Sequence, residues 1–389
     1  MKRFIFSTFA AIAIVAISPA FYSCSSDDPD NPDDPTASQQ FKNNEKTLQT
    51  YVDDVVVPTY RELADAAILL ADACNDLSSQ EKVNNACQHW LDARRYWELS
   101  EAFLFGAAAD YNIDPHIDSW PLDLGQLDAV LKAGDISARI EAGTAGYGLL
   151  GFHAVEYVIF MEGSTGDINN RVRNYSSISA AEAEFAAAVA TDMRNQCVRL
   201  EAAWAGFNNI SSSKQKILID AELEPTTDYG ERIIAAGQAG NTKYKTQNAA
   251  FEEILVGASD IANEVANTKI SDPMDSHQWS DVESPHSWNS VADFADNIRS
   301  IRNAYFGTLD GSVSAYSVSA VIASINAAAD NKVKTAIDAA IIAVEAMPKP
   351  FRNYIGETSG PNFIAIQNAV DACNNLVDAI DEAQEIINL

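Results

Sequence analysis

Residues 146–161 read GYGLLGFHAVEYVIFM, an apolar run that contains the most informative polar pair of the chain. His153 and Glu156 are its only side chains that ionise readily near neutral pH. A helix that is apolar around its whole circumference belongs inside a bundle. Residues three apart share a helix face, so the imidazole and the carboxylate should converge on one point. Because a carboxylate is almost never buried without a partner, something must meet them there.

The rest of the chain is also helical in character. Ala, Leu, Glu and Lys recur at three-and-four spacing, whereas alternating Thr/Val/Ile segments bounded by glycine turns are nearly absent. We therefore predict an all-α protein of two helical bundles packed side by side, residues 41–210 and 211–389. The predicted helices are 41–74 with a kink or break at Pro58, 80–105, 124–132, 137–141, 146–161, 180–207, 242–268, 291–306, 318–328, 332–347 and 361–387. Residues 106–121 and 271–287 are predicted to be irregular.

The N-terminus has the pattern of an export signal. Met1-Lys2-Arg3 precedes an apolar stretch, and residues 1–23 read as a signal peptide. Cys24, followed by Ser and Asp, resembles the lipid-bearing first residue of Bacteroidetes-type lipoproteins; the alternative is an ordinary cleaved signal. Residues 24–40 are too polar and Pro-rich for a core and are predicted to be a disordered tether. We expect an outer-membrane lipoprotein, surface-exposed or periplasmic, that contacts the membrane only through the lipid on Cys24.

Charge excludes some partners. The chain has a net charge of −29, which becomes −31 without Lys2 and Arg3. Such an acidic chain is not expected to bind nucleic acid or an anionic membrane surface. The cysteines beyond Cys24 match no metal-binding spacing, so we expect them to be small buried hydrophobes, although their pairing cannot be read from the sequence: Cys74, Cys87, Cys197 and Cys373.

Two interpretations of His153 and Glu156 remain open at this point. The structural one is a buried pair that also engages an arginine of a neighbouring helix, Arg94, Arg95 or Arg299. The functional one is a metal or substrate site, because neutral imidazole and carboxylate are common ligands of zinc, iron and manganese.

A second group of candidates lies in the helix predicted at 80–105 and in the loop after it. One helical stripe carries Trp90, Arg94, Trp97 and Glu101; the two charges are seven residues apart, so we expect them to contact different partners. The loop at 114–121 contains Asp118, which is either a ligand or part of a surface turn.

A third group precedes the helix predicted at 291–306. The residues ESPHSWNS at 283–290 lie where free backbone N–H groups of a helix start could bind an anion or a carboxylate. The alternative is ordinary N-capping by Ser287, Asn289 or Ser290.

These segments together resemble the imelysin family, which is grouped with the peptidases as M75. GFHAVE at 151–156 fits the family's Gly-x-His-x-x-Glu motif. The segments at 51–70, 90–106 and 284–307 also resemble imelysin segments, in the same order, so that the resemblance covers nearly the whole mature chain. It implies two helical bundles with the motif near their interface, in an exported protein linked with iron acquisition.

The resemblance also implies site residues. The motif falls on Gly151, His153 and Glu156, and the second helix supplies Trp90, Arg94, Trp97 and Glu101. The second half supplies Ser287, Asn289, Ser290, Asp293 and Asn297. From these we predict metal ligands at His153, Glu156 and Glu101, and ligand contacts at Trp97, Glu101, Asp118, Ser287, Asn289 and Asp293.

Two functions follow from this set. A metallopeptidase would use His153 and Glu156 as catalytic residues, but a catalytic zinc needs about three protein ligands, and the chain has no His-Glu-x-x-His. The third ligand would have to come from another histidine: His89, His116, His277 or His286. We favour a noncatalytic envelope protein that binds a divalent metal (iron or zinc), an iron-containing ligand or another envelope protein.

Overall fold

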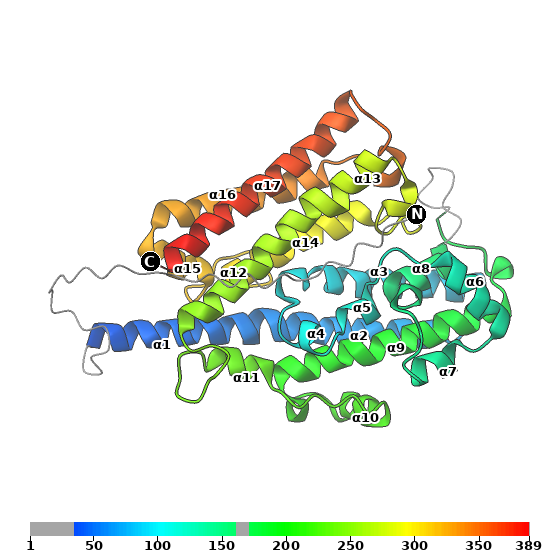
Figure 1. Cartoon of the computed structure of the whole chain (residues 1–389), viewed down its shortest axis with the longest axis horizontal. Coiled ribbons are helices and arrows are strands. Elements are labelled where there is room, and N and C mark those ends of the chain that lie inside the picture. Colours follow the sequence, from blue (N-terminus) through cyan, green and yellow to red (C-terminus); the bar gives the residue numbers. More distant parts are fainter. Residues whose placement is uncertain (1–34, 161–170, 389) are drawn as a thin grey trace, which may run out of the picture. The chain divides into compact units, whose positions relative to one another are not determined.

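The computed structural model describes residues 35–160 and 171–388, and helices are the only regular secondary structure within these two ranges (Figure 1). The predicted all-α class is confirmed. The predicted signal peptide and Cys24 lie outside the described residues. None of the described helices is both long and apolar enough to cross a membrane.

The first half of the chain contains long helices, as predicted, and several short helices between them. In chain order they are α1 (Pro35–Thr50), η1 (Tyr51–Val56), α2 (Val57–Cys74), α3 (Gln80–Glu98), η2 (Glu101–Phe103), α4 (Ala107–Asp110), α5 (Asp114–Ile117), α6 (Leu124–Ala133), α7 (Ile136–Glu141), η3 (Tyr147–Leu149), α8 (Gly151–Phe160), η5 (Tyr175–Ser177) and α9 (Ala180–Ala205). The first helix begins at Pro35, inside the segment predicted as a tether. The break predicted at Pro58 is a π-helical turn, η1, directly before α2, whose first turn contains Pro58. Because η1 runs directly into α2, Pro58 lies inside a continuous helical run, and the π-helical turn accommodates the residue that lacks an N–H donor.

The second half continues with helices throughout. They are η6 (Phe207–Asn209), α10 (Ser212–Asp220), α11 (Tyr229–Ile234), α12 (Gln247–Glu264), η7 (Val265–Ile270), α13 (Ser271–Ser276), η8 (Trp279–Asp281), α14 (Ser290–Phe306), α15 (Val318–Ile325), α16 (Ala327–Glu345), η9 (Phe351–Asn353) and α17 (Pro361–Ile387). The sequence predicts neither α10 nor α11, which are too short for a clear period. The prediction of irregular structure from residue 271 is wrong at its start, because α12 continues through the π-helical turn η7 into α13.

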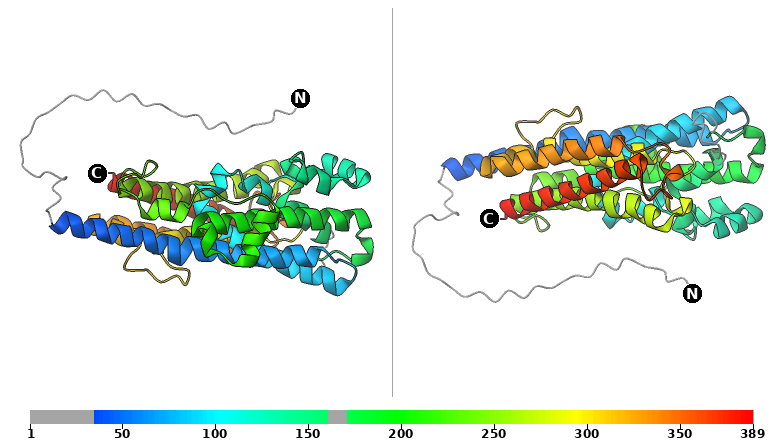
Figure 2. Two further views of the ribbon diagram at one scale, coloured as in Figure 1. Left: turned by 90° about the horizontal axis from the view of Figure 1, so that it is seen from below. Right: turned by 90° about the horizontal axis from the view of Figure 1, so that it is seen from above.

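The helices of residues 41–388 pack in two groups within one compact unit. In one group α2 contacts α3 and α9, and α8 contacts α3 and α9; in the other α17 contacts α12 and α16, and α14 contacts α12 and α16. Figures 1 and 2 show the two groups as adjoining layers of helices. They meet where α14 contacts α3 and where α12 contacts η2, and one hydrophobic core continues through both. The proposed domain boundary at residue 210 therefore stays a prediction.

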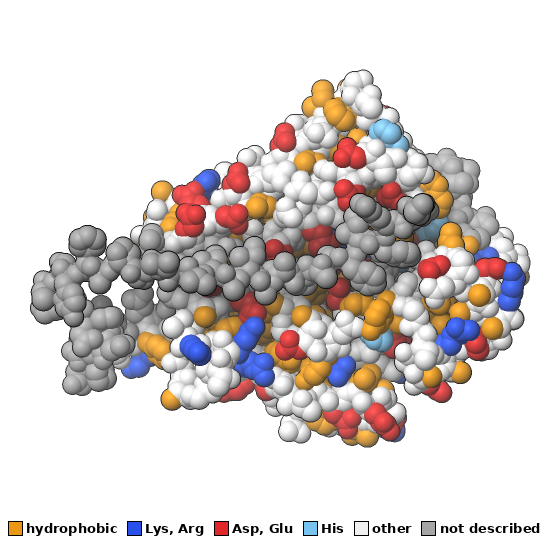
Figure 3. Space-filling view, viewed as in Figure 1, with side chains coloured by type: hydrophobic (Ala, Val, Ile, Leu, Met, Phe, Trp, Pro, Cys, Tyr) orange, Lys and Arg blue, Asp and Glu red, His pale blue; other side chains and the backbone are white. Residues whose placement is uncertain are grey.

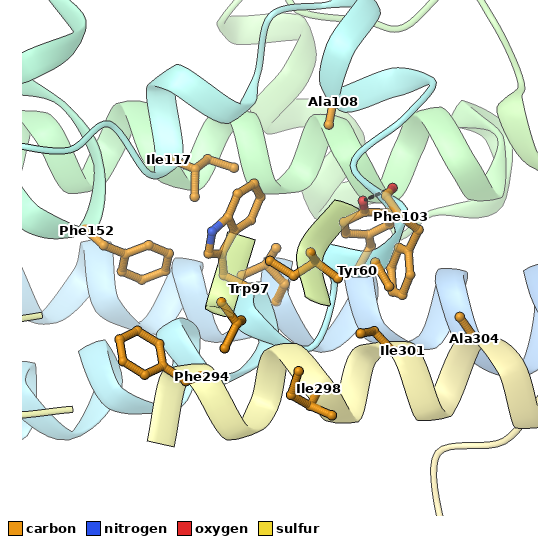
Figure 4. Packing of buried hydrophobic residues seen from close by; sticks show 14 of the residues in the cluster. Tyr60, Trp97, Phe103, Ala108, Ile117, Phe152, Phe294, Ile298, Ile301 and Ala304 are labelled. Atoms are coloured by element: carbon orange, nitrogen blue, oxygen red, sulfur yellow. Dashed lines mark hydrogen bonds between the residues drawn. The ribbon is translucent and has the colours of Figure 1, made fainter. Parts of the chain in front are cut away.

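Trp97 of α3 lies in the part of the core that joins the groups. It is fully buried, and Figure 4 shows its indole among side chains that include Ile117, Phe152 of α8 and Phe294 of α14. A buried tryptophan contributes a large apolar contact area. This packing fixes the inner face of α3 against α14 and so positions the polar residues of α3 described below.

The cysteines Cys74, Cys87, Cys197 and Cys373 are buried and have free thiols. Their predicted role as small buried hydrophobes is confirmed.

Candidate functional site

Gly151 explains why the motif helix can approach the loop before it. Its φ is +80°, and a Cβ at this position would lie 2.2 Å from the carbonyl oxygen of Ile117. Only glycine tolerates both this backbone conformation and this close approach. As a result, the chain at Ile117 and Asp118 passes directly against the start of α8, beside His153.

His153 is buried between two carboxylates. Its Nδ1 lies 3.4 Å from Oε2 of Glu156, its Nε2 lies 3.1 Å from Oδ1 of Asp118, and its side chain is 1% exposed. The ring packs on the indole of Trp120 with 4.5 Å between centroids. Burial lowers the pKa of His153, but the carboxylates of Asp118 and Glu156 outweigh this effect and raise the pKa to about 9. The imidazole is therefore a cation at neutral pH.

Glu156 is bound by the loop that precedes α14. Its Oε1 accepts hydrogen bonds from the backbone N–H groups of His286, at 3.0 Å, and Ser287, at 2.7 Å. Burial raises the pKa of Glu156. The hydrogen bond with His153, the charges of His286 and His153, and the backbone N–H of Ser287 outweigh burial and lower the pKa. The predicted anion-binding character of this segment is confirmed, and the carboxylate that it binds belongs to the motif itself.

The arginine predicted to pair with Glu156 is not found among the described residues. Arg95 is exposed, and Arg299 pairs with Asp296 at 2.6 Å and with Glu345. Arg94 is fully buried, but it contacts other carboxylates. The structural interpretation correctly predicted that His153 and Glu156 form a buried pair. It is wrong in predicting that an arginine contacts this pair.

Arg94 of α3 is the centre of that network. Its guanidinium contacts four buried carboxylates, which come from both helix groups: Glu98 (Nη2–Oε1, 2.5 Å), Glu283 (Nη2–Oε1, 2.5 Å), Asp293 (Nε–Oδ2, 3.5 Å) and Asp118 (Nη1–Oδ1). A single guanidinium cannot neutralise four carboxylates. Burial raises the pKa of Glu98 well above its usual value and that of Asp293 to about 6, so protons or a further cation must offset the remaining negative charge.

Asp118 connects Arg94 with the motif. It follows the last residue of α5, and one of its oxygens accepts a hydrogen bond from the Trp97 indole N–H at 2.7 Å. Burial alone raises the pKa of Asp118, but the Arg94 guanidinium and the His153 imidazole hold it well below the usual value. The interpretation as a surface turn is wrong, because the Asp118 side chain is 7% exposed, and its role as a ligand stays a prediction.

The segment before α14 binds a second carboxylate. Asp293 accepts hydrogen bonds from the hydroxyl of Ser284 at 2.5 Å and from the amide of Asn289 at 2.6 Å. Burial raises the pKa of Asp293 to about 6. The alternative of N-capping is wrong: Asn289 is the N-cap residue without a capping hydrogen bond, and the hydroxyls of Ser287 and Ser290 donate to backbone oxygens of Ser284 and Glu283.

A cavity of about 280 Å³ lies beside this network. It is lined mainly by acidic residues: Glu101, Leu104, Asp114, Asp118, Trp120, Glu264, Thr268, Lys269, Asp281 and Glu283. The single basic residue of this lining is Lys269, whose Nζ lies 3.1 Å from Oε1 of Glu283 and 3.9 Å from Oε2 of Glu98. Burial, followed by the charge of Asp118, raises the pKa of Asp114 to about 7. The cavity is therefore suited to a cation.

Glu101 faces this cavity without a bound partner. The residue is 9% exposed, and among the described residues no hydrogen bond or ion pair within 4.0 Å reaches its carboxylate. Burial raises the pKa of Glu101. A buried carboxylate of this kind is usually paired or bound to a metal. Glu101 is thus a buried residue of the cavity that could accept a ligand.

Two sets of three side chains could hold a metal ion in the described part of the chain. Asp118, His153 and Glu283 form one set, and Glu98, Glu101 and Asp118 form the other; in each, the ligand atoms lie within 4.8 Å of one another. Nε2 of His153 lies 3.1 Å from Asp118 of the same set, and Oε2 of Glu283 is buried without a hydrogen-bond partner. The first set, with one imidazole, suits zinc or iron, and the second, with oxygen atoms alone, suits harder cations. Glu156, predicted as a ligand, belongs to neither set.

The other histidines do not join His153 in these sets. The ring of His116 contacts Asp192 at 2.8 Å, and that of His277 contacts the backbone oxygen of Ile355 at 2.8 Å. His286 packs between Tyr157 and Trp279. Its backbone N–H binds Glu156, but its ring belongs to neither set, so none of these three histidines supplies the third ligand that a peptidase would need.

Sequence analysis missed several residues of the site. Glu98 lies four residues after Arg94, a spacing that could have indicated the pair. Glu283 begins the quoted segment before α14 but has no local signal of its own. Lys269 lies within the π-helical turn η7, and no sequence pattern would have identified it.

Comparison with known proteins gives matches over most of the chain. The sequence model of imelysin, peptidase M75, matches residues 56–380. The iron-regulated protein A of Synechococcus elongatus is 26% identical over 339 residues, which are 86% of this chain and 84% of that protein. Both matches extend across the two helix groups.

Solved structures show the same fold. A protein of Parabacteroides distasonis, named as an iron-regulated protein A precursor, has a TM-score of 0.73 and 28% identity, and the match covers 89% of this chain and 95% of that one. An imelysin-like protein of Psychrobacter arcticum has a TM-score of 0.59 at 14% identity, over 87% of this chain and 93% of that one. At this lower identity the likeness concerns the fold alone.

Proposed function

We propose a function for this chain, which belongs to the imelysin family as its resemblance predicted. It is a cell-envelope protein that takes part in iron acquisition and binds a metal cation at the carboxylates around Asp118. The relatives named as iron-regulated protein A support the link with iron. The name of the Parabacteroides protein as a precursor fits the export signal predicted for residues 1–23. Attachment through a lipid on Cys24 is part of the same proposal.

One observation carries the proposal: carboxylates outnumber cations in the buried network and its cavity. Arg94, Lys269 and the charged form of His153 face a larger set of acidic side chains: Glu98, Glu101, Asp114, Asp118, Glu264, Glu283 and Asp293. Uncompensated carboxylates in a low-dielectric interior repel each other and favour the entry of a cation. On the face shown in Figure 3, acidic side chains also gather over the part formed by α12 to α17, which favours the approach of cations.

The ligands that fit best are Asp118, His153 and Glu283. Asp118 belongs to both candidate sets, Nε2 of His153 faces it at 3.1 Å, and Oε2 of Glu283 has no hydrogen-bond partner. A metal at Nε2 requires a neutral imidazole, so binding would release a proton from His153. Glu156 holds the other nitrogen of the ring and thereby orients it, as carboxylates commonly do behind a metal-bound histidine.

A peptidase is the alternative function, and the burial of the motif argues against it. His153 is 1% exposed and Glu156 is fully buried, and neither lines the cavity. A general base must come within hydrogen-bond reach of a water or substrate group. Both oxygens of Glu156 are already engaged, by His153 and by the N–H groups at 286 and 287.

Metal content provides the test. The mature chain, freed of metal by a chelator, is dialysed without oxygen against Fe²⁺, Zn²⁺ or Mn²⁺ and analysed for bound metal. We expect about one equivalent in the wild type and a large loss in Asp118→Asn. The matched control is Asp128→Asn, which removes an exposed aspartate paired with Lys132. Equal metal content in all three proteins would refute the proposal.

The peptidase alternative is tested on the same samples. Unfolded protein substrates are incubated with wild type and with Glu156→Gln, with and without chelator. Cleavage that depends on both Glu156 and metal would favour the peptidase over the binding protein.

A further inference from the structure

Lys269 lies in the position that a bound cation would take. Its side chain is buried, and its ammonium lies within 4.0 Å of two carboxylates, 3.1 Å from Glu283 and 3.9 Å from Glu98. It also lines the same cavity as Glu101, the buried carboxylate without a partner. An ammonium is a compact point charge and can substitute for a metal ion among carboxylates.

The π-helical turn η7 brings Lys269 to this place. Ser271 donates its backbone N–H to the oxygen of Ala266, five residues earlier, which is the hydrogen bond of a π-helix. In an α-helix, residues five apart point about 140° away from each other. Across the wider turn the angle between them is smaller, and Glu264 and Lys269 both line the cavity. The π-helical turn therefore allows both side chains to line one cavity, which a regular α-helix would not allow.

We propose that Lys269 is a resident cation of the metal site, and that a metal binds by displacing its ammonium from Glu283 and Glu98. The lysine stem has four rotatable bonds, so its head group can move without a backbone change. Glu264 and Asp281 line the same cavity but are exposed at its outer part. They offer the displaced ammonium carboxylates nearer to solvent. Without metal, the ammonium of Lys269 limits the repulsion among the inner carboxylates. When a metal binds, the ammonium moves away from Glu283 and Glu98.

This exchange also defines which ligands the site selects. A monovalent ion brings no more charge than the ammonium that it replaces, whereas a divalent or trivalent metal brings a net gain. A ligand without strong positive charge has no means of displacing Lys269. The inference thus rests on the proposed function and adds to it a residue that sets affinity and a preference for multivalent cations.

Removing the charge of Lys269 tests this inference. Mn²⁺ is the probe, because it accepts nitrogen and oxygen ligands and its binding can be followed by calorimetry and by the loss of the free-ion resonance signal. Lys269→Met should bind Mn²⁺ at least about tenfold more tightly than wild type, since a competing charge is lost. Lys269→Arg keeps the charge and should not tighten binding. Lys132→Met, which removes an exposed lysine elsewhere, should change the affinity by less than about twofold.

A labelling experiment on the wild type covers the case in which Lys269→Met does not fold. Reductive methylation followed by peptide mass spectrometry measures how fast each lysine reacts. Saturating Mn²⁺ should accelerate the modification of Lys269 several-fold and leave that of Lys132 unchanged. Protection of Lys269 by Mn²⁺, or no change, would overturn the exchange.

The outcomes separate this inference from the proposed function. If the wild type binds Mn²⁺ and Asp118→Asn does not, but Lys269→Met binds no more tightly, the metal site stands and the exchange is wrong. If neither the wild type nor Lys269→Met binds Mn²⁺, Fe²⁺ or Zn²⁺, both are wrong. Binding by Lys269→Met alone would overturn the exchange, because it would show that the metal does not displace the ammonium in the wild type.

Discussion

Nε2 of His153 lies 3.1 Å from Oδ1 of Asp118, the same oxygen that contacts the guanidinium of Arg94. This contact joins the motif helix α8 to the charge network of α3. Glu156 holds the opposite nitrogen of the ring, so that the motif residues lie behind Asp118 rather than in the cavity. The motif therefore meets both candidate metal sets at Asp118, the carboxylate that they share, and His153 itself belongs to one of them.

Arg94 should be essential for stability, because four buried carboxylates depend on it. We expect Arg94→Gln to lower the free energy of unfolding by about 3–5 kcal/mol at pH 7. The adjacent Arg95 is exposed, and Arg95→Gln should change stability by less than about 0.5 kcal/mol. Urea unfolding of both variants measures the difference. The deficit of Arg94→Gln should shrink toward pH 5, where the carboxylates can protonate; a deficit that grows on acidification would contradict the charge argument.

The sequence predicts most of the long helices, but it predicts only part of the candidate site. Helices α9, α14, α16 and α17 follow from their periodicity, and the apolar run around His153 correctly indicated a buried helix with a partnered carboxylate. The identity of the partner could not be read, because Glu156 is bound by backbone N–H groups, which every residue has.

The charge network was beyond sequence reasoning for a second reason. Arg94 and Glu283 meet only because α3 packs on α14, a tertiary contact that no local pattern specifies. Lys269 depends on the π-helical turn η7, and the apolar spacing of α12 would continue as a regular helix. Composition did indicate an acidic protein suited to cations, but not where the charges converge.

Gly151 should not tolerate a side chain. Gly151→Ala places a Cβ against the Ile117 carbonyl oxygen at a φ of +80°, so we expect a loss of about 2–4 kcal/mol and displacement of the segment that carries Asp118. Gly125→Ala is the control, because it lies in helix α6 and its Cβ would meet nothing closer than 3.4 Å. Thermal unfolding compares the two variants. A Gly151→Ala protein as stable as Gly125→Ala would show that the close approach is unimportant.

His153 should make stability depend on pH in the metal-free protein. Its pKa is about 9 in the folded state, above the ordinary value of 6.5, so its contribution is fully present below pH 6.5 and is lost as the pH rises through 9. The stability difference between wild type and His153→Gln should therefore be largest at pH 6, on the order of 3 kcal/mol, and smallest near pH 9.5. Chemical unfolding in the presence of a chelator measures it. His89→Gln, at a partly exposed site on α3, should stay within about 0.5 kcal/mol of wild type at each pH. A difference that increases with pH would show that the buried imidazole is neutral.

Glu156 should hold the loop before α14 in place. Glu156→Ala leaves the backbone N–H groups of His286 and Ser287 without their acceptor, and a hydrogen bond to a charged group contributes about 1.5–3 kcal/mol. Amide hydrogen exchange at these two positions should accelerate by about 10- to 100-fold, as measured by mass spectrometry on short peptides. Glu156→Gln keeps an oxygen acceptor and should give a smaller change. Glu184→Ala, at an exposed position of α9, should leave exchange at 286 and 287 as in wild type. Unchanged exchange in Glu156→Ala would mean that contacts other than this carboxylate hold the loop, and that Glu156 serves His153 alone.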